Sequence, residues 1–206
     1  MSHFQTRLHQ SDSSGRFSET LYTPELDKTN VIFLAPHGGQ VEPNTEQLAQ
    51  LLQQKFPQRS GVWYTTGITN GTFNDSFSRW HTTDETHSVE DFPLYQKLTE
   101  SHYQIAIGIH VMSKEGIIIG GQANTTLQQE IQDNLREQFD SQPIVLGTEQ
   151  SSLSGLNPNN FVNTLHSRNA LHFELSRRIS MEEPEKFVDT LSEWLTEYLR
   201  RYSEDL

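Results

Sequence analysis

Short apolar runs alternate along this chain with longer stretches in which apolar residues recur at helical spacing. Continuous apolar runs are typical of strands buried on both faces of a sheet, and amphipathic stretches are typical of helices that cover a sheet. We predict strands at residues 31–36, 62–66, 104–110, 116–119, 143–146 and 170–175, and helices at residues 44–56, 90–101, 124–139 and 184–201. This order predicts an α/β fold, with a mixed central sheet flanked by helices in three layers.

Two polar segments interrupt this order, at residues 67–91 and 148–169. Both are longer than ordinary connections, and long loops in compact domains are often functional. A length of 206 residues suits one domain better than two, so we expect a single domain over residues 1–206. We expect the polar residues 1–20 to form a peripheral or flexible segment.

Acidic side chains outnumber basic ones by 27 to 15, which gives a formal net charge of -12. Such a charge argues against nucleic acid and against an anionic membrane as partners. The chain has no cysteine, so any metal must be held by nitrogen and oxygen atoms. The polar N-terminus lacks the apolar stretch of a signal peptide, which predicts a cytoplasmic protein, released on lysis if a phage encodes it. The oligomeric state stays open.

A histidine and a glutamate, His37 and Glu42, share a short glycine loop at the end of the first apolar strand, and His110 ends the strand at 104–110. Two imidazoles and one carboxylate are the ligand set of hydrolytic zinc centres. The pair Gly38 and Gly39 permits a sharp turn that would let His37 and Glu42 converge. We therefore predict one zinc ion with a fourth position for a water, whose pKa the metal would lower towards about 7.

A general base is also needed, and Glu174 is the best candidate. Strand alternation directs His172 and Glu174 to one face and their apolar neighbours to the other. The alternative is that this face is the solvated side of an edge strand. His81, inside the first long polar segment, is a candidate to bind a substrate carboxylate or a developing oxyanion, or else an exposed loop side chain.

Several segments in this order resemble the phage and bacterial poly-γ-glutamate hydrolases, which include proteins labelled phage-related replication proteins. The resemblance covers most of the chain. The matching segments are Pro36–Gly39 with Glu42 and Thr45, Trp80–Thr83, Ile107–His110 followed by Gly120 and Gly121, Asn157–Asn163, and Leu171–Ser176.

Such proteins are zinc-dependent peptidases of carboxypeptidase-like α/β fold that cut γ-glutamyl amide bonds. The resemblance implies that His37, Glu42 and His110 hold zinc, that Glu174 is the base, and that His81 and Asn163 line the substrate groove. The chain also departs from the pattern. Thr164 stands where the family usually has an arginine, so Arg168 is expected to bind the substrate carboxylate instead, with Arg177 as the other candidate; His172 stands where glutamine is usual.

Together these features predict a zinc-dependent hydrolase that cleaves γ-glutamyl amide bonds of poly-γ-glutamate. One alternative keeps the zinc chemistry but changes the substrate to another peptide or N-acyl amide. A second alternative is a non-catalytic, phage-associated binding protein of the same fold. A panel of γ-linked, α-linked and N-acyl substrates separates the first two, and metal analysis separates both from the third.

Overall fold

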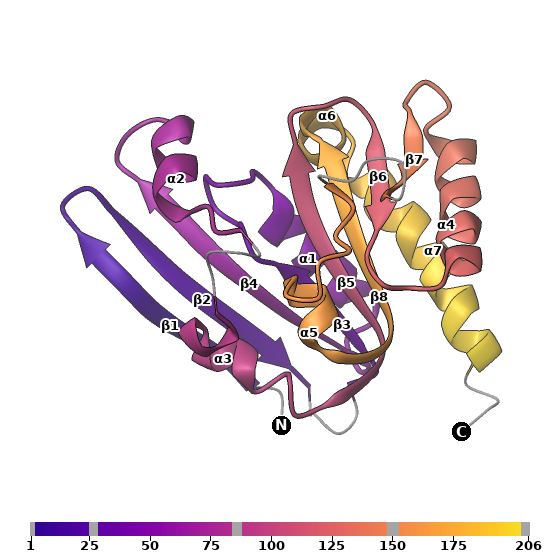
Figure 1. The fold of residues 1–206 in the computed structure, drawn as a ribbon, viewed down its shortest axis with the longest axis horizontal. Helices are drawn as coiled ribbons and strands as arrows, with labels where there is room; N and C mark the ends of the chain where they lie inside the picture. Colours follow the sequence, from indigo (N-terminus) through magenta and orange to yellow (C-terminus); the bar gives the residue numbers. More distant parts are fainter. Residues whose placement is uncertain (1–2, 25–28, 84–87, 148–152, 203–206) are drawn as a thin grey trace.

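A computed structural model describes residues 3–24, 29–83, 88–147 and 153–202, and these form a mixed sheet between two helical layers (Figure 1). The strand order across the sheet is β1-β2-β4-β3-β5-β8-β6-β7. The strands are β1 (His3–Asp12), β2 (Gly15–Thr23), β3 (Val31–Ala35), β4 (Ser60–Thr69), β5 (His102–Met112), β6 (Ile117–Gly120), β7 (Ile144–Leu146) and β8 (His166–Ser176). The predicted three-layer α/β architecture is confirmed.

The centre of the sheet is parallel, because β3 pairs in parallel with β4 and β5, and β5 pairs in parallel with β8. The carboxyl ends of β3, β5 and β8 therefore meet at one edge, where ligands usually bind in α/β folds. In this register His110 of β5 lies beside Glu174 of β8. The flanks run the other way, with β2 antiparallel to β4 and β6 antiparallel to β8.

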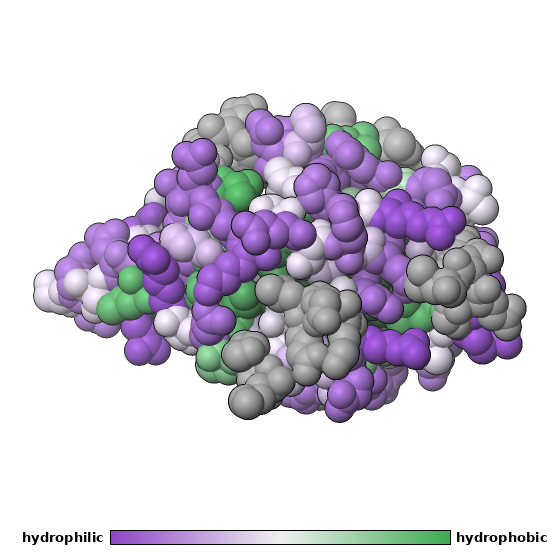
Figure 2. All heavy atoms as spheres, turned by 90° about the horizontal axis from the view of Figure 1, so that it is seen from below, coloured by the Kyte–Doolittle hydropathy of each residue, from purple (hydrophilic) through white to green (hydrophobic). Residues whose placement is uncertain are grey.

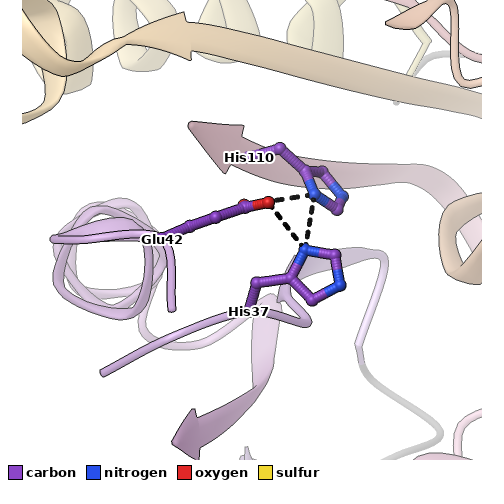
Figure 3. A group of neighbouring side chains, drawn as sticks. All are labelled: His37, Glu42 and His110. Atoms are coloured by element: carbon purple, nitrogen blue, oxygen red, sulfur yellow. Dashed lines mark hydrogen bonds and ion pairs between the residues drawn. The ribbon is translucent and has the colours of Figure 1, made fainter. Parts of the chain in front are cut away.

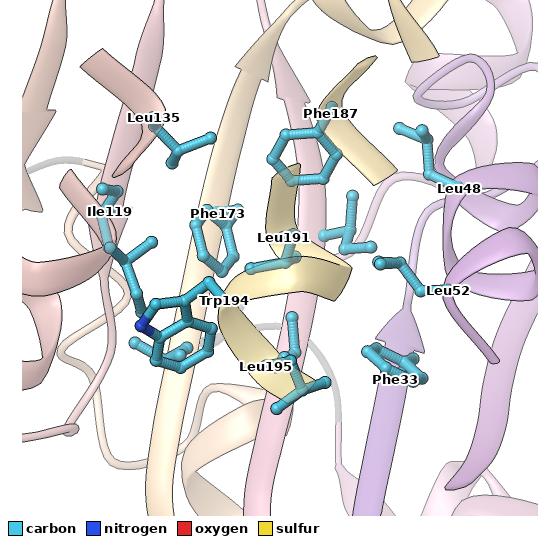
Figure 4. Close-up of a cluster of buried hydrophobic side chains, with 14 of the residues drawn as sticks. Phe33, Leu48, Leu52, Ile119, Leu135, Phe173, Phe187, Leu191, Trp194 and Leu195 are labelled. Carbon is cyan, nitrogen blue, oxygen red and sulfur yellow. The ribbon is translucent and has the colours of Figure 1, made fainter. Parts of the chain in front are cut away.

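Three long helices cover one face of the sheet: α1 (Thr45–Lys55), α4 (Thr125–Gln138) and α7 (Pro184–Tyr202). Their apolar sides pack with the sheet in one buried cluster, drawn in part in Figure 4, where Phe173 of the sheet lies near Leu191 and Trp194 of α7, and Phe33 lies near Leu52 of α1. This layer is the one that the apolar periodicity predicts best. Its packing fixes the strands whose ends carry the candidate site.

Shorter helical segments cover the other face: α2 (Phe73–Trp80), the 3-10 turn η2 (Val89–Asp91), α3 (Pro93–Gln96) and α5 (Phe161–Thr164). A second buried cluster joins them to the sheet, with Trp63 in contact with the rings of Tyr95 and Phe161. A further helix, α6 (Arg177–Glu182), follows β8 directly.

The six predicted strands each coincide with an observed strand, and residues 3–20 of the N-terminal segment contribute to two strands that the apolar pattern does not predict. It is peripheral, but it forms the regular strands β1 and β2 at the outer end of the sheet. Its polarity follows from its place at an edge, where β1 is largely exposed. As an edge strand, β1 lacks the continuous apolar run of a buried strand, and β2, between β1 and β4, has polar residues such as Glu19 and Thr20 at buried positions, so the pattern predicts neither strand.

One predicted helix and one predicted loop also need correction. The single helix predicted at 90–101 is replaced by η2 and the short α3, because Pro93 lacks the amide hydrogen that would continue a helix through it. The polar segment 67–91 contains α2, while its residues 84–87, like residues 148–152 of the second polar segment, lie outside the described residues.

The edge of the sheet opposite the candidate site faces the viewer in Figure 2, and its described residues are mainly hydrophilic with scattered apolar ones. Among the described residues, no helix has the length and apolar character needed to cross a membrane.

Candidate metal centre

The turn after β3 brings His37 and Glu42 together. The backbone amide of Glu42 donates to the carbonyl of His37 at 2.7 Å, which closes the loop between them. Gly39 adopts a φ of 77°, and a Cβ at Gly38 would lie 2.3 Å from the carbonyl oxygen of Thr65. Only glycines fit this path, so the predicted role of the Gly-Gly pair in the turn is confirmed.

His110 completes a triangle of donor atoms at the end of β5 (Figure 3). Nδ1 of His37 lies 2.8 Å from Oε1 of Glu42, and Nδ1 of His110 lies 3.2 Å from Nδ1 of His37 and 3.3 Å from Oε2 of Glu42. Zinc bonds of about 2.0–2.1 Å in tetrahedral geometry set donors roughly 3.3–3.4 Å apart. The three residues therefore fit a metal ion, as the sequence predicts.

Neighbouring groups orient these donors. Nε2 of His37 lies 2.8 Å from the carbonyl oxygen of Thr82, so Nε2 carries the proton and donates it there. The lone pair of Nδ1 is then directed to the centre of the triangle. The backbone amide of Val111 donates to Oε2 of Glu42 at 3.0 Å and holds that carboxylate in place.

Burial and mutual charge set the protonation states. Burial alone would raise the pKa of Glu42, but the adjacent His37 and His110 hold it well below its usual value. Burial lowers the pKa of His110, although the nearby carboxylate of Glu42 acts to raise it. Burial also acts to lower the pKa of His37, but Glu42 and the bond to Thr82 outweigh it and raise that pKa. A proton on His37 therefore competes with a metal ion more strongly than it would on an unperturbed imidazole.

The candidate base lies directly beside this triangle. Glu174 is 8 % exposed and opens into the same cavity as the three donors. Its Oε1 lies 3.1 Å from Nε2 of His172, and the ring of His172 stacks on that of His110 with centroids 4.5 Å apart. Because β8 lies between β5 and β6, the alternative of a solvated edge strand is wrong.

His81 also reaches the cavity, just beyond the end of α2. Its ring packs against His37, at 4.4 Å between centroids, and stacks on Phe77 at 4.2 Å. Nε2 of His81 lies 3.5 Å from Oε1 of Glu42, while a quarter of the side chain is exposed. It is therefore neither a remote loop side chain nor a member of the donor triangle.

The two other predicted substrate residues lie elsewhere. Asn163 is outside the cavity lining, and its Nδ2 donates to the carbonyls of Gly155 and Asn157, at 2.7 Å each. Arg168 is exposed near the start of β8, six residues before Glu174, which at about 3.3 Å per residue separates them by about 20 Å. The structure thus places Arg168 towards the opposite edge of the sheet.

Arg177, the other arginine that the sequence offered, does line the cavity. It begins α6 immediately after β8, and its guanidinium carbon lies 4.4 Å from the ring centroid of Phe73. The cavity measures about 630 Å³. Sequence reasoning missed further residues of its wall, Phe73, Phe77 and Lys114. The spacing of Phe73 and Phe77, four residues apart, was the available signal for a helix in that polar segment.

Residues 5–187 match the profile of a protein family described as poly-gamma-glutamate hydrolase. The chain belongs to this family. The predicted family resemblance is thereby confirmed, and with it the prediction of a hydrolytic enzyme of the zinc-peptidase type.

Solved structures of similar fold agree with this membership. A bacteriophage poly-gamma-glutamate hydrolase superimposes with a TM-score of 0.71 at 16% identity, over 92% of each chain. The zinc-free form of the protein YNDL superimposes with a TM-score of 0.67 at 17% identity, over 91% of this chain and 92% of that one. At such identities the likeness shows the shared fold. No curated protein sequence matches the chain significantly.

Proposed function

We propose that this protein is a zinc-dependent hydrolase that cleaves γ-glutamyl amide bonds of poly-γ-glutamate, with one ion held by His37, Glu42 and His110. The observation that carries the proposal is the buried triangle of donor atoms, with a carboxylate outside the triangle opening into the same cavity. Membership of the poly-gamma-glutamate hydrolase family supports the substrate. The existence of a similarly folded protein described as zinc-free supports the metal.

A zinc ion held by His37, Glu42 and His110 would supply Lewis acidity, which would polarise the scissile carbonyl and lower the pKa of a water molecule to near neutrality. Glu174 accepts the proton of that attacking water and transfers it to the nitrogen of the leaving amine. His81, whose ring packs against that of His37, donates a hydrogen bond to the substrate oxygen or carboxylate.

Recognition of the polymer depends on local positive charge. Each γ-linked glutamate keeps a free carboxylate, and a chain of net charge -12 repels such a polymer beyond a screening length of about 8–10 Å. Within the cavity, Arg177 and Lys114 supply positive charge close to the metal centre. The ring of Phe73 holds the guanidinium of Arg177, whose planar shape suits a carboxylate better than an ammonium does.

One observation favours a second substrate class. Thr164, which replaces the usual family arginine, directs its hydroxyl to that of Tyr95 at 2.6 Å and does not line the cavity. The alternative is therefore a zinc amidohydrolase or carboxypeptidase with the same chemistry that acts on another peptide or N-acyl amide. In that case Arg177 binds a single terminal carboxylate.

A substrate panel tests the proposal. Purified protein is mixed with one equivalent of zinc, and its bound metal is measured. It is then incubated with poly-γ-glutamate, an α-linked glutamate peptide of equal length and an N-acyl amino acid, and released amines are measured. Cleavage of the γ-linked polymer alone is the expected result. Cleavage restricted to the α-linked or N-acyl substrate establishes the alternative, and absence of both metal binding and cleavage supports a binding protein.

A further inference from the structure

The buried imidazole of His172 lies beside the candidate base without belonging to the donor triangle. It is 3 % exposed, and its Nε2 lies 3.1 Å from Oε1 of Glu174. Its other nitrogen, Nδ1, is buried and has no hydrogen-bond partner among the described residues. A neutral imidazole carries one N–H, and Nε2 has an acceptor where Nδ1 has none. The proton therefore belongs on Nε2, which donates it to Glu174.

The surrounding packing fixes the ring that makes this bond. The His172 ring stacks on His110 at an interplanar angle of 29°. Gly155 also lies against it, because a Cβ at Gly155 would lie 2.4 Å from Cγ of His172. Two hydrogen bonds from Asn163, to Gly155 and Asn157, hold this loop in place. The ring has little freedom to turn away from Glu174.

We propose that His172 is a positioning residue for Glu174. Its Nε2–H binds Oε1, so that the carboxylate presents Oε2 to the attacking water. Within the described part of the chain Oε2 accepts no hydrogen bond, as this role requires. The inference rests on the proposed hydrolase function, and it assigns a purpose to Asn163 as well: support of the loop that packs on His172.

Variants that differ only in the reach of an N–H donor test this role. The amide of glutamine extends as far from the backbone as Nε2 of histidine, whereas that of asparagine extends only as far as Nδ1. We expect His172→Gln to keep kcat within about threefold of the native value, and His172→Asn to lower it about 10- to 100-fold, the range seen when a hydrogen-bond partner that orients a residue of a metal site is lost. KM and bound zinc stay unchanged in both. Equal losses in the two variants, or a loss of zinc that parallels the loss of kcat, overturn the proposal.

A second measurement does not depend on turnover. Long-range 1H–15N correlation spectra identify which imidazole nitrogen carries the proton. We expect His172 to be protonated at Nε2 in the native protein, and its Nε2 resonance to move in Glu174→Ala. A proton on Nδ1, or resonances unaffected by Glu174→Ala, overturns the inference. Native protein that shows the expected spectra yet cleaves no γ-glutamyl substrate contradicts the proposed function instead.

Discussion

The floor and the rim of the cavity differ in construction. The floor consists of the donor triangle, His37, Glu42 and His110. These residues are 5–7 % exposed, and both histidines pair with the carboxylate of Glu42. The rim includes Phe77, which is 44 % exposed, and the exposed Arg177. A buried, mutually bonded floor tolerates little change, while an exposed rim can vary with the substrate. We therefore expect changes in the floor to abolish the chemistry and changes in the rim to alter affinity.

The largest effect is expected for His110→Ala. It removes one of three donors, so we expect bound zinc to fall from about one equivalent to near zero and hydrolysis to be lost. His102→Ala is the matched control, because His102 is an exposed histidine at the start of the same strand. Metal analysis and activity are measured on both. Full zinc content in His110→Ala would show that His110 is not a zinc ligand.

Glu174→Gln separates the base from the metal ligands. Loss of a general base costs about 10²- to 10⁴-fold in kcat. Zinc content is expected to stay at the native level, because Glu174 is not part of the triangle. Single-turnover kinetics and metal analysis check this. If the variant instead loses its zinc, Glu174 acts as a ligand and the division of roles is wrong.

Changes at the rim are expected to act on KM. Loss of a hydrogen bond to a charged group costs about 1.5–3 kcal/mol, so Arg177→Ala is expected to raise KM for γ-glutamyl oligomers at least about tenfold with little change in kcat. Arg168→Ala, at the far end of β8, is expected to change neither. Steady-state kinetics of the pair decide between the two arginines, and the reverse pattern would restore Arg168 to the site.

The smallest effect concerns pH. The pKa of His37 is raised by its carboxylate neighbour, and a proton on Nδ1 competes with the metal. Zinc affinity is therefore expected to be constant above this raised pKa and to fall as pH drops below it, by up to about tenfold per pH unit. Titration with a zinc chelator from pH 8 to pH 5 measures the slope. An affinity that rises towards low pH would contradict the assigned ligand.

The sequence predicted the floor better than the rim, for a physical reason. His37, Glu42, His110 and Glu174 lie at strand ends or beside glycines, and parallel strands carry such residues to a common edge. Arg168 is close to Glu174 in the sequence but not in space, because the extended strand β8 separates them. Arg177 stays at the cavity because α6 begins directly after β8. Sequence reasoning missed the hairpin β1–β2 because the edge strand β1 is polar and exposed, and the interior strand β2 buries polar residues such as Glu19 and Thr20.

The proposed function requires that the side chains of His37, Glu42 and His110 enclose one zinc ion. Anomalous diffraction at the zinc absorption edge, from crystals of zinc-loaded protein, tests it directly. We expect a single strong peak about 2.0–2.2 Å from Nδ1 of His37, Nδ1 of His110 and a carboxylate oxygen of Glu42. A peak coordinated by other residues, or no peak at this position in protein shown to be zinc-loaded, would contradict it.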